Sequence, residues 1–380
     1  MNFGLTKEQE LVKQMAAEFV KNEVEPLAKE VDATERYPIE TMKKMAKYNM
    51  MGMPYPKELG GAGADYLSYI MVVEELAKAC TTTSTAFSAH TSLCSWPIYN
   101  FGTEDQKKRY LPDLFSGKKI GAFALTEPNA GTDSAAQQTT AKKDGDYYVL
   151  NGSKIFITNG GYADTFVTFA MTDKSRGTKG ISAFIIERGM PGFTIGKVED
   201  KMGIRGSSTT ELIYEDLRIP AANLLGKEGK GFKVAMMTLD GGRIGIGAQA
   251  LGIAEGALEY AINYMKERKQ FGKPLSAFQG LQWYVAEMKT KVEAAKYLVY
   301  KAAWKKQEGM PFTMDAAEAK LFAAETAMFV TTKAVQILGG YGYTKDYPLE
   351  RMMRDAKITE IYEGTSEVQK MVIASNLLRK

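Results

Sequence analysis

The spacing of apolar residues changes twice along the chain, and this pattern limits the possible folds most strongly. Up to about residue 118 and again after Gly231, apolar side chains recur every three or four positions, which is typical of helices that bury one face. Between these regions stand short runs of β-branched and aromatic residues bounded by Gly, Pro and Asp. The 380-residue sequence therefore predicts helices, then strands, then helices, with enough chain for two or three domains.

We expect an α+β protein of three domains. An N-terminal all-α domain takes residues 1–118, a central antiparallel β-barrel or β-sandwich takes residues 119–230, and a C-terminal antiparallel helical bundle takes residues 231–380. In the last domain, an apolar stripe from Leu281 to Ala302 spans more than five helical turns, and Gly309–Pro311 separates it from the next helix. Four or five such helices fit a bundle.

Local signals place the ends of several elements. Thr6–Gln9 and Thr103–Gln106 are capping boxes, in which the threonine and the glutamine each satisfy a free backbone N–H at a helix start. Asp144–Gly145 and Asn151–Gly152 are dipeptides that tolerate the positive φ of tight hairpin turns. These two dipeptides predict three short strands within residues 139–160.

Composition removes several function classes. The chain carries 49 basic and 45 acidic side chains, a net charge of +4, with no charged block of the kind that binds nucleic acid. Its two cysteines cannot form a disulfide framework, and its single histidine cannot build a histidine-rich metal site or a catalytic triad. No signal peptide is visible, and the uncharged stretch 79–103 contains Pro97 and many hydroxyls, so no membrane span is expected. We expect a cytoplasmic protein without a nucleic-acid or membrane partner and without a metal site.

Glu363 is the most informative acidic residue. It stands between Tyr362 and Gly364 in a largely apolar segment, and the glycine would let a ligand approach the backbone closely. Thr365 and Ser366 then resemble the start of a final helix, whose free N–H groups attract anions. From these residues alone, Glu363 is either a catalytic carboxylate or a solvated side chain next to a helix cap.

Two further segments have both a ligand-binding and a structural explanation. Residues 121–133 place hydroxyls and glycines after a strand-like run, where they either contact a ligand or form an ordinary turn. Arg268 and Lys269 end a predicted helix, where they either bind a phosphate or complement the helix dipole.

Other patterns favour packing over chemistry. Gly245–Gly247 resembles part of a dinucleotide-binding fingerprint, but it lies inside a helical pattern, whereas that fingerprint follows a strand and opens a helix. Small residues there predict close packing of helices. His90 and Cys94 lack the partners that a zinc or thiol site needs, so we expect them in the core or in a pocket wall.

Taken together, these segments make the sequence similar to the acyl-CoA dehydrogenase family over nearly its whole length, and in particular to its short-chain, butyryl-type members. Four blocks carry the resemblance in the expected order: FALTEPNAGTD (123–133), KIFITNG (154–160), ERKQFGKPL (267–275), and QILGGYGYTKDYPLERMMRD together with IYEGTSEVQ (336–369). The resemblance also implies a C-terminal four-helix bundle.

The resemblance assigns roles to individual residues. It implies that Glu363 is the catalytic base and that the acyl-CoA side of the site holds Asp240, Arg243, Tyr362 and Gly364. It implies that FAD is the cofactor and that a second subunit completes the FAD site, so that the protein is a homo-oligomer, usually a tetramer. The positions that match FAD contacts are Phe123, Leu125, Thr126, Gly131, Thr132, Phe156, Ile157, Thr158, Arg268, Phe271, Gln279, Gln336, Gly339, Gly340, Thr365 and Glu367.

The implied reaction is the conversion of butyryl-CoA to crotonyl-CoA, with electrons passing to an electron-transfer flavoprotein. Relatives with the base on another helix carry it at the position of Gly242, and relatives acting on glutaryl-CoA need an arginine near Ser84; this chain has neither feature. Gln249 and Thr359 resemble the polar residues that shorten the acyl pocket. The alternatives are a medium- or branched-chain dehydrogenase, an acyl-CoA oxidase, or a catalytically silent helical scaffold.

Overall fold

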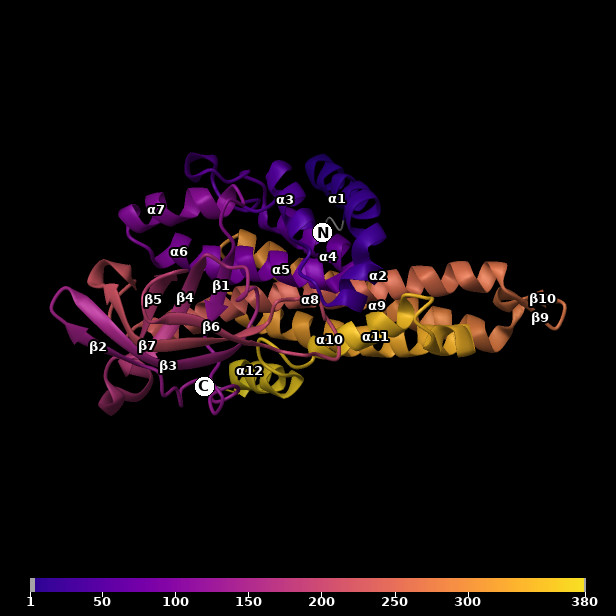
Figure 1. Ribbon diagram of the computed structural model, residues 1–380. Helices are drawn as coiled ribbons and strands as arrows, with labels where there is room; N and C mark the ends of the chain where they lie inside the picture. Colours follow the sequence, from indigo (N-terminus) through magenta and orange to yellow (C-terminus); the bar gives the residue numbers. More distant parts are fainter. Residues whose placement is uncertain (1–3, 379–380) are drawn as a thin grey trace.

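The computed structural model describes residues 4–378, and Figure 1 shows helices at both ends of the chain and strands in the middle. Both expected capping boxes are present, at the starts of α1 and α7. The helix α4 is buried on nearly all sides because it packs between α1 and the C-terminal helix α8 (Gly231–Glu267). The N-terminal helices are α1 (Lys7–Phe19), α2 (Glu25–Thr34), α3 (Ile39–Lys47), α4 (Tyr66–Ala79), α5 (Thr81–Ser88), α6 (Trp96–Phe101) and α7 (Glu104–Phe115).

Two π-helical segments widen this helical region. They are η1 (Val20–Val24) and η3 (Ala89–Ser95), and each runs into a helix whose first turn contains a proline. Proline has no N–H to donate, so the carbonyl four residues earlier loses its usual partner and the wider turn is favoured. The segment η3 lies between the sheet and α8 and therefore connects two parts of the site described below.

The central strands form one sheet of eight strands in the order β6-β7-β3-β2-β4-β5-β8, with β1 beside β4. Of the two expected arrangements, a β-barrel or a β-sandwich, the barrel is wrong, because this sheet does not close. It is also mixed, because β1 and β2 both pair with β4 in parallel. The strands are β1 (Gly121–Ala124), β2 (Thr140–Asp144), β3 (Tyr147–Ile157), β4 (Thr165–Met171), β5 (Ile181–Glu187), β6 (Phe193–Val198), β7 (Thr210–Pro220) and β8 (Leu224–Leu225).

Only one of the two expected hairpin turns is present. Gly145 has φ 57° in the turn between β2 and β3, as expected. The second prediction is wrong, because β3 continues through Asn151 and Gly152 with a bulge against β7. Asn151 Oδ1 accepts a hydrogen bond from the N–H of Asp216 at 2.8 Å, and a Cβ at Gly152 would lie 2.6 Å from Thr139 Oγ1. The glycine is thus required by close approach of the chain rather than by a turn.

The C-terminal helices run side by side, and the short hairpin of β9 and β10 lies at their tip, far from the sheet (Figure 1). Gly245–Gly247 lies inside α8, where a Cβ at Gly245 would come within 2.8 Å of Ser88 Oγ, so the packing interpretation is confirmed. Besides α8, the elements are β9 (Lys269–Gln270), β10 (Lys273–Pro274), α9 (Gln279–Gln307), α10 (Thr313–Leu338), α11 (Leu349–Ile358) and α12 (Ser366–Leu378).

One helical run, Thr313–Tyr343, is long and apolar enough to cross a membrane by length and composition alone, with a mean hydropathy of 1.2. Half of its most apolar window is buried inside the protein, where α10 packs against α8 and α9. A core helix of a bundle has the same character.

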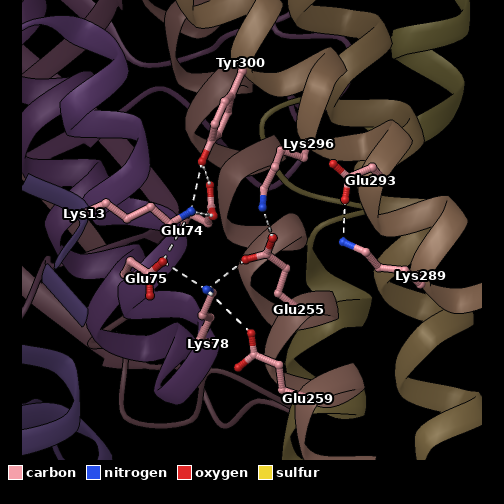
Figure 2. A network of polar contacts seen from close by, with 10 residues as sticks. All are labelled: Lys13, Glu74, Glu75, Lys78, Glu255, Glu259, Lys289, Glu293, Lys296 and Tyr300. Carbon is pink, nitrogen blue, oxygen red and sulfur yellow. Dashed lines mark hydrogen bonds and ion pairs between the residues drawn. The ribbon is translucent and has the colours of Figure 1, made fainter. Parts of the chain in front are cut away.

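Buried charges connect the N-terminal helices to the bundle (Figure 2). Three of these carboxylates, from Glu74, Glu75 and Glu255, lie close enough together to hold a metal ion. Three lysines balance their charge: Lys78 lies 3.0 Å from oxygens of both Glu75 and Glu255, Lys13 lies 2.7 Å from Glu74, and Lys296 lies 2.6 Å from Glu255. This balance of charges gives the cluster a structural role between α1, α4, α8 and α9.

Candidate active site

Glu363 lies in the turn between α11 and α12, and its backbone conformation is unusual. Glu363 has φ 54° and Gly364 has φ 96°, so two consecutive residues occupy the left-handed region. For a glutamate this conformation is strained, which is a frequent property of residues at functional sites. The N–H of Glu363 donates to no acceptor among the described residues. The turn therefore leaves both a carboxylate and a backbone donor available.

The carboxylate of Glu363 points against α8. A Cβ built at Gly242 would lie 2.1 Å from Glu363 Oε2 and 2.9 Å from Leu93 Cδ2, so only a glycine leaves room for the carboxylate there. Glu363 Oε2 is buried and, within residues 4–378, has no hydrogen-bond partner. Burial raises the pKa of Glu363 to about 7, and the nearby cations Lys320 and Arg243 partly oppose this rise. A desolvated carboxylate of this kind is a suitable proton acceptor near neutral pH.

Arg243 and Asp240, both on α8, support the turn from one side. The guanidinium of Arg243 donates to the carbonyl of Glu363 at 3.4 Å and to Asp240 Oδ1 at 2.7 Å. Asp240 Oδ2 accepts from the hydroxyl of Thr313 at 2.9 Å, and burial raises the pKa of Asp240. The structure thus brings the expected residues Asp240, Arg243, Tyr362 and Gly364 together around Glu363.

Two buried side chains that sequence reasoning missed support the turn from the other side. Lys320 on α10 donates to the carbonyl of Gly364 at 2.6 Å, and Gln369 on α12 donates to the same carbonyl at 2.8 Å. Both side chains are fully buried. A signal was available for Lys320, since it is a charged residue at a position where the spacing of Ala316 and Ala323 predicts a buried helix face.

A group of polar side chains lies next to Glu363. Tyr362 donates its hydroxyl to Gln249 Oε1, and the amide nitrogen of Gln249 is buried without a partner among the described residues. Thr359 is also fully buried and donates to the carbonyl of Ala356 at 2.7 Å. Gln249 and Thr359 come from α8 and from the end of α11, so only the tertiary fold brings these regions together.

The expected FAD contacts from this region lie on β1, on the loop after it, on β3 and in the turn directly after β3. The hydroxyls of Thr126 and Thr158 have no hydrogen-bond partner within the described part of the chain. The ring of Phe156 is 58% exposed, and this residue has φ 58°. Ile157 and Leu125 are buried in the core, so a contact from Ile157 would come from its backbone. The other residues of this set are Phe123, which is half-buried, and Gly131 and Thr132, which are exposed.

A buried ion pair holds the loop after β1. Lys154 on β3 donates to Glu127 Oε1 at 2.8 Å, to Gln137 Oε1 at 2.9 Å and to the carbonyl of Leu125 at 3.0 Å. Glu127 also accepts from the backbone N–H of Thr139 at 3.1 Å. Burial lowers the pKa of Lys154 to about 8, and Glu127 opposes this shift. Sequence reasoning assigned no role to Lys154, although it opens the KIFITNG block.

The segment η3 contacts both β1 and α8, and it therefore connects the sheet to the region of Glu363. His90 Nδ1 accepts from the N–H of Gly121 at 3.0 Å, and Leu93 packs against Gly242, the residue that faces the Glu363 carboxylate. His90 and Cys94 are both fully buried in this wall, as the sequence predicts. Burial lowers the pKa of His90 to about 4, so it is neutral at pH 7.

Six of the remaining expected FAD residues are separated from Glu363 within one chain. Lys320 and Leu338 lie on the same helix, 18 residues apart, which corresponds to about 27 Å along its axis. Phe271 is 93% exposed at the tip of the bundle. The residues at that end are Arg268, Phe271, Gln279, Gln336, Gly339 and Gly340, all exposed, whereas Thr365 and Glu367 lie at the start of α12 beside Glu363.

Comparison with known proteins identifies the family of this chain. The acyl-CoA dehydrogenase N-terminal, middle and C-terminal domain models match residues 6–118, 122–217 and 229–378. The chain is 68% identical over 379 residues to a short-chain specific acyl-CoA dehydrogenase of Clostridium acetobutylicum, with all of both chains covered.

Two solved structures superpose on it over the full length of both chains. One is the butyryl-CoA dehydrogenase of Megasphaera elsdenii, with 56% identity and a TM-score of 0.98. The other comes from work on the electron transferring flavoprotein of Acidaminococcus fermentans and flavin-based electron bifurcation, with 59% identity and a TM-score of 0.99. The chain therefore belongs to the acyl-CoA dehydrogenase family, and it is an oxidoreductase.

Proposed function

We propose that this protein is a short-chain acyl-CoA dehydrogenase that uses FAD and in which Glu363 removes the α-proton of the substrate. The observation that carries the proposal is the buried Oε2 of Glu363, which has no hydrogen-bond partner among the described residues. An unpaired buried carboxylate oxygen is costly unless a ligand contacts it. An acyl thioester placed between Glu363 and the sheet would present its acidic C–H to this oxygen.

The chain's own groups lower the barrier to proton removal. The free N–H of Glu363 is available to donate to the thioester oxygen, where negative charge develops as the α-proton leaves. One such donor contributes about 3–4 kcal/mol in comparable sites. Desolvation makes Glu363 a stronger base than a carboxylate in water, and Arg243 and Lys320 keep it ionisable near pH 7. When bound, FAD would accept the hydride that leaves the β-carbon.

The residues of the sheet are suitable for holding FAD. The hydroxyls of Thr126 and Thr158 have no partner among the described residues and lie on neighbouring segments. Phe156 on β3 offers an exposed ring two residues before Thr158, which lies in the turn directly after that strand. A side chain at Gly131 would meet nothing within 4 Å, so the loop is open to a cofactor there. We propose that Arg268 and the other exposed residues at the tip of the bundle complete the FAD site of a second subunit, which makes the protein a homo-oligomer.

Substrate length and electron acceptor follow from the same site and its relatives. Gln249 and Thr359 are polar and fully buried, and Tyr362 donates its hydroxyl to Gln249, which disfavours a long apolar chain in this region. The high identity to a short-chain specific enzyme supports this preference. The likeness to a chain studied with an electron transferring flavoprotein supports such a flavoprotein as the electron acceptor.

The test is the Glu363→Gln variant, which keeps the shape of the side chain but removes the base. We expect bound flavin as in the wild type, seen in its visible absorbance, and a loss of about 10²–10⁴-fold in the rate at which butyryl-CoA bleaches that absorbance. Glu318→Gln is the matched control, because it makes the same change at a glutamate on α10 that has no role in the proposed site. This variant should keep the wild-type rate. Substantial turnover by Glu363→Gln would place the base elsewhere.

Further measurements separate the alternatives. Rates with C4 to C10 acyl-CoAs, with and without oxygen, distinguish a short-chain dehydrogenase from a longer-chain enzyme or an oxidase. A purified protein that is colourless and cannot be reconstituted with FAD would favour the silent scaffold.

A further inference from the structure

Lys320 is a buried cation without a carboxylate partner. Its side chain is fully buried on α10, yet within residues 4–378 no carboxylate oxygen lies within 4.0 Å of its amino group. Its single hydrogen bond goes to the carbonyl of Gly364, at 2.6 Å. Burying an unpaired ammonium is unfavourable, so a position of this kind calls for an explanation beyond packing.

The carbonyl that Lys320 contacts belongs to the residue directly after the base. Gln369 donates to the same oxygen at 2.8 Å, so helices α10 and α12 both hold this one carbonyl. Glu363 and Gly364 have φ values of 54° and 96°. A positive φ is strained for Glu363, because it is not a glycine. The hydrogen bonds from Lys320 and Gln369 to the carbonyl of Gly364 hold this strained turn in one conformation.

Two cations, Lys320 and Arg243, act on Glu363, and only Lys320 is not already paired with another carboxylate. Arg243 also faces the base, from α8, but its guanidinium is already paired with Asp240 at 2.7 Å. From α4, Tyr66 and Tyr69 face Glu363, and burial keeps both phenols protonated by raising their pKa. Tyr362, in the same turn, is protonated for the same reason.

Few other charges reach Lys320 itself. Glu363 is the strongest, followed by the cation of Arg243 and by Glu360 and Glu367 at either end of the turn. Burial lowers the pKa of Lys320 to about 8, and these carboxylates oppose that shift. Lys320 is thus mostly charged at pH 7, next to a carboxylate that must be charged to act as a base.

We propose that Lys320 is a positioning residue for the proton-removing carboxylate: it fixes the turn through the Gly364 carbonyl and stabilises the ionised form of Glu363. This inference rests on Glu363 being the base. In the proposed reaction, α10 contributes no group that touches the substrate. The inference nevertheless makes the pH dependence of the rate depend on Lys320 of this helix.

The experiment compares holoenzymes of the wild type, Lys320→Met and Lys333→Met. Lys333 lies on the same helix, 13 residues further on, and provides the matched control. The rate of flavin bleaching by butyryl-CoA is measured in single turnovers from pH 6 to pH 10. Without the charge of Lys320, the apparent pKa of the base rises by about one unit or more, which makes the rate about fivefold lower at pH 7.

Two further variants separate charge from geometry. Lys320→Arg keeps the cation and should retain a midpoint near that of the wild type. Gln369→Met removes the second donor without a change in charge, so it should lower the rate at every pH and leave the midpoint unchanged. If Lys320→Met does not retain flavin, Lys320→Gln, which keeps a donor but loses the charge, takes its place in the comparison.

A midpoint of the neutral Lys320 variant that coincides with that of Lys333→Met would overturn the inference. The Glu363→Gln variant in the same assay tells the two proposals apart. If Glu363→Gln still bleaches the flavin, the assignment of the base fails, and the role of Lys320 fails with it. If Glu363→Gln is inactive and the Lys320 midpoint does not move, only the role of Lys320 fails.

Discussion

If Glu363 is the base as proposed, replacing Gly242 by alanine should abolish most of the activity without unfolding the protein. A Cβ at this position would lie 2.1 Å from Glu363 Oε2, whereas a carbon and an oxygen in contact are about 3.3 Å apart, so the carboxylate must retreat by about 1 Å. The end of a glutamate side chain can move, and alanine favours a helix over glycine by about 1 kcal/mol. Leu93, at 2.9 Å, must also shift slightly. We therefore expect a nearly unchanged unfolding temperature.

The activity of Gly242→Ala should fall by about 10²-fold, because a displacement of about 1 Å at a reacting group costs about that much in rate. Single-turnover bleaching of the flavin by butyryl-CoA measures this loss, and thermal unfolding measures the stability. Combining Gly242→Ala with Glu363→Asp provides an internal check. The shorter aspartate has room beside the new methyl group, so the double variant should lose less than the product of the two single losses. A Gly242→Ala rate within about twofold of the wild type would refute this description of the site.

Two further predictions address substrate length and the FAD loop. Gln249→Ala removes the acceptor for the Tyr362 hydroxyl and opens space beside it. The ratio of kcat/KM for C6 to that for C4 acyl-CoA should then rise by about fourfold per added methylene, because each buried CH2 contributes about 0.8 kcal/mol. An unchanged ratio would mean that these side chains do not limit the length of the acyl chain. Lys154→Met leaves Glu127 buried without its cation, which costs about 3–5 kcal/mol, and releases the loop after β1. We expect a lower unfolding temperature and loss of flavin on gel filtration, with the exposed Lys143→Met as control; full flavin retention would contradict a role of Lys154 in holding the loop.

The sequence by itself determined the order of the elements and several of their ends. The capping boxes at Thr6 and Thr103 and the turn at Gly145 depend on hydrogen bonds and φ angles within a few residues, so a local pattern is sufficient to predict them. The family resemblance also singled out Glu363 and the residues around it. The residues alone left open whether that carboxylate is buried or solvated.

The tertiary structure decided the points that depend on distant segments. Asn151–Gly152 continues a strand because of its neighbours on β7 and beside Thr139, and the sheet is mixed because β1 and β2 return to the same strand, β4. The same holds for Glu363: its carboxylate fits against Gly242 on α8, and the cation that most strongly opposes the rise of its pKa is Lys320 on α10. Desolvation and charge act over a few ångströms in space, and the segments that meet there are far apart in the chain, so no local pattern contains this information.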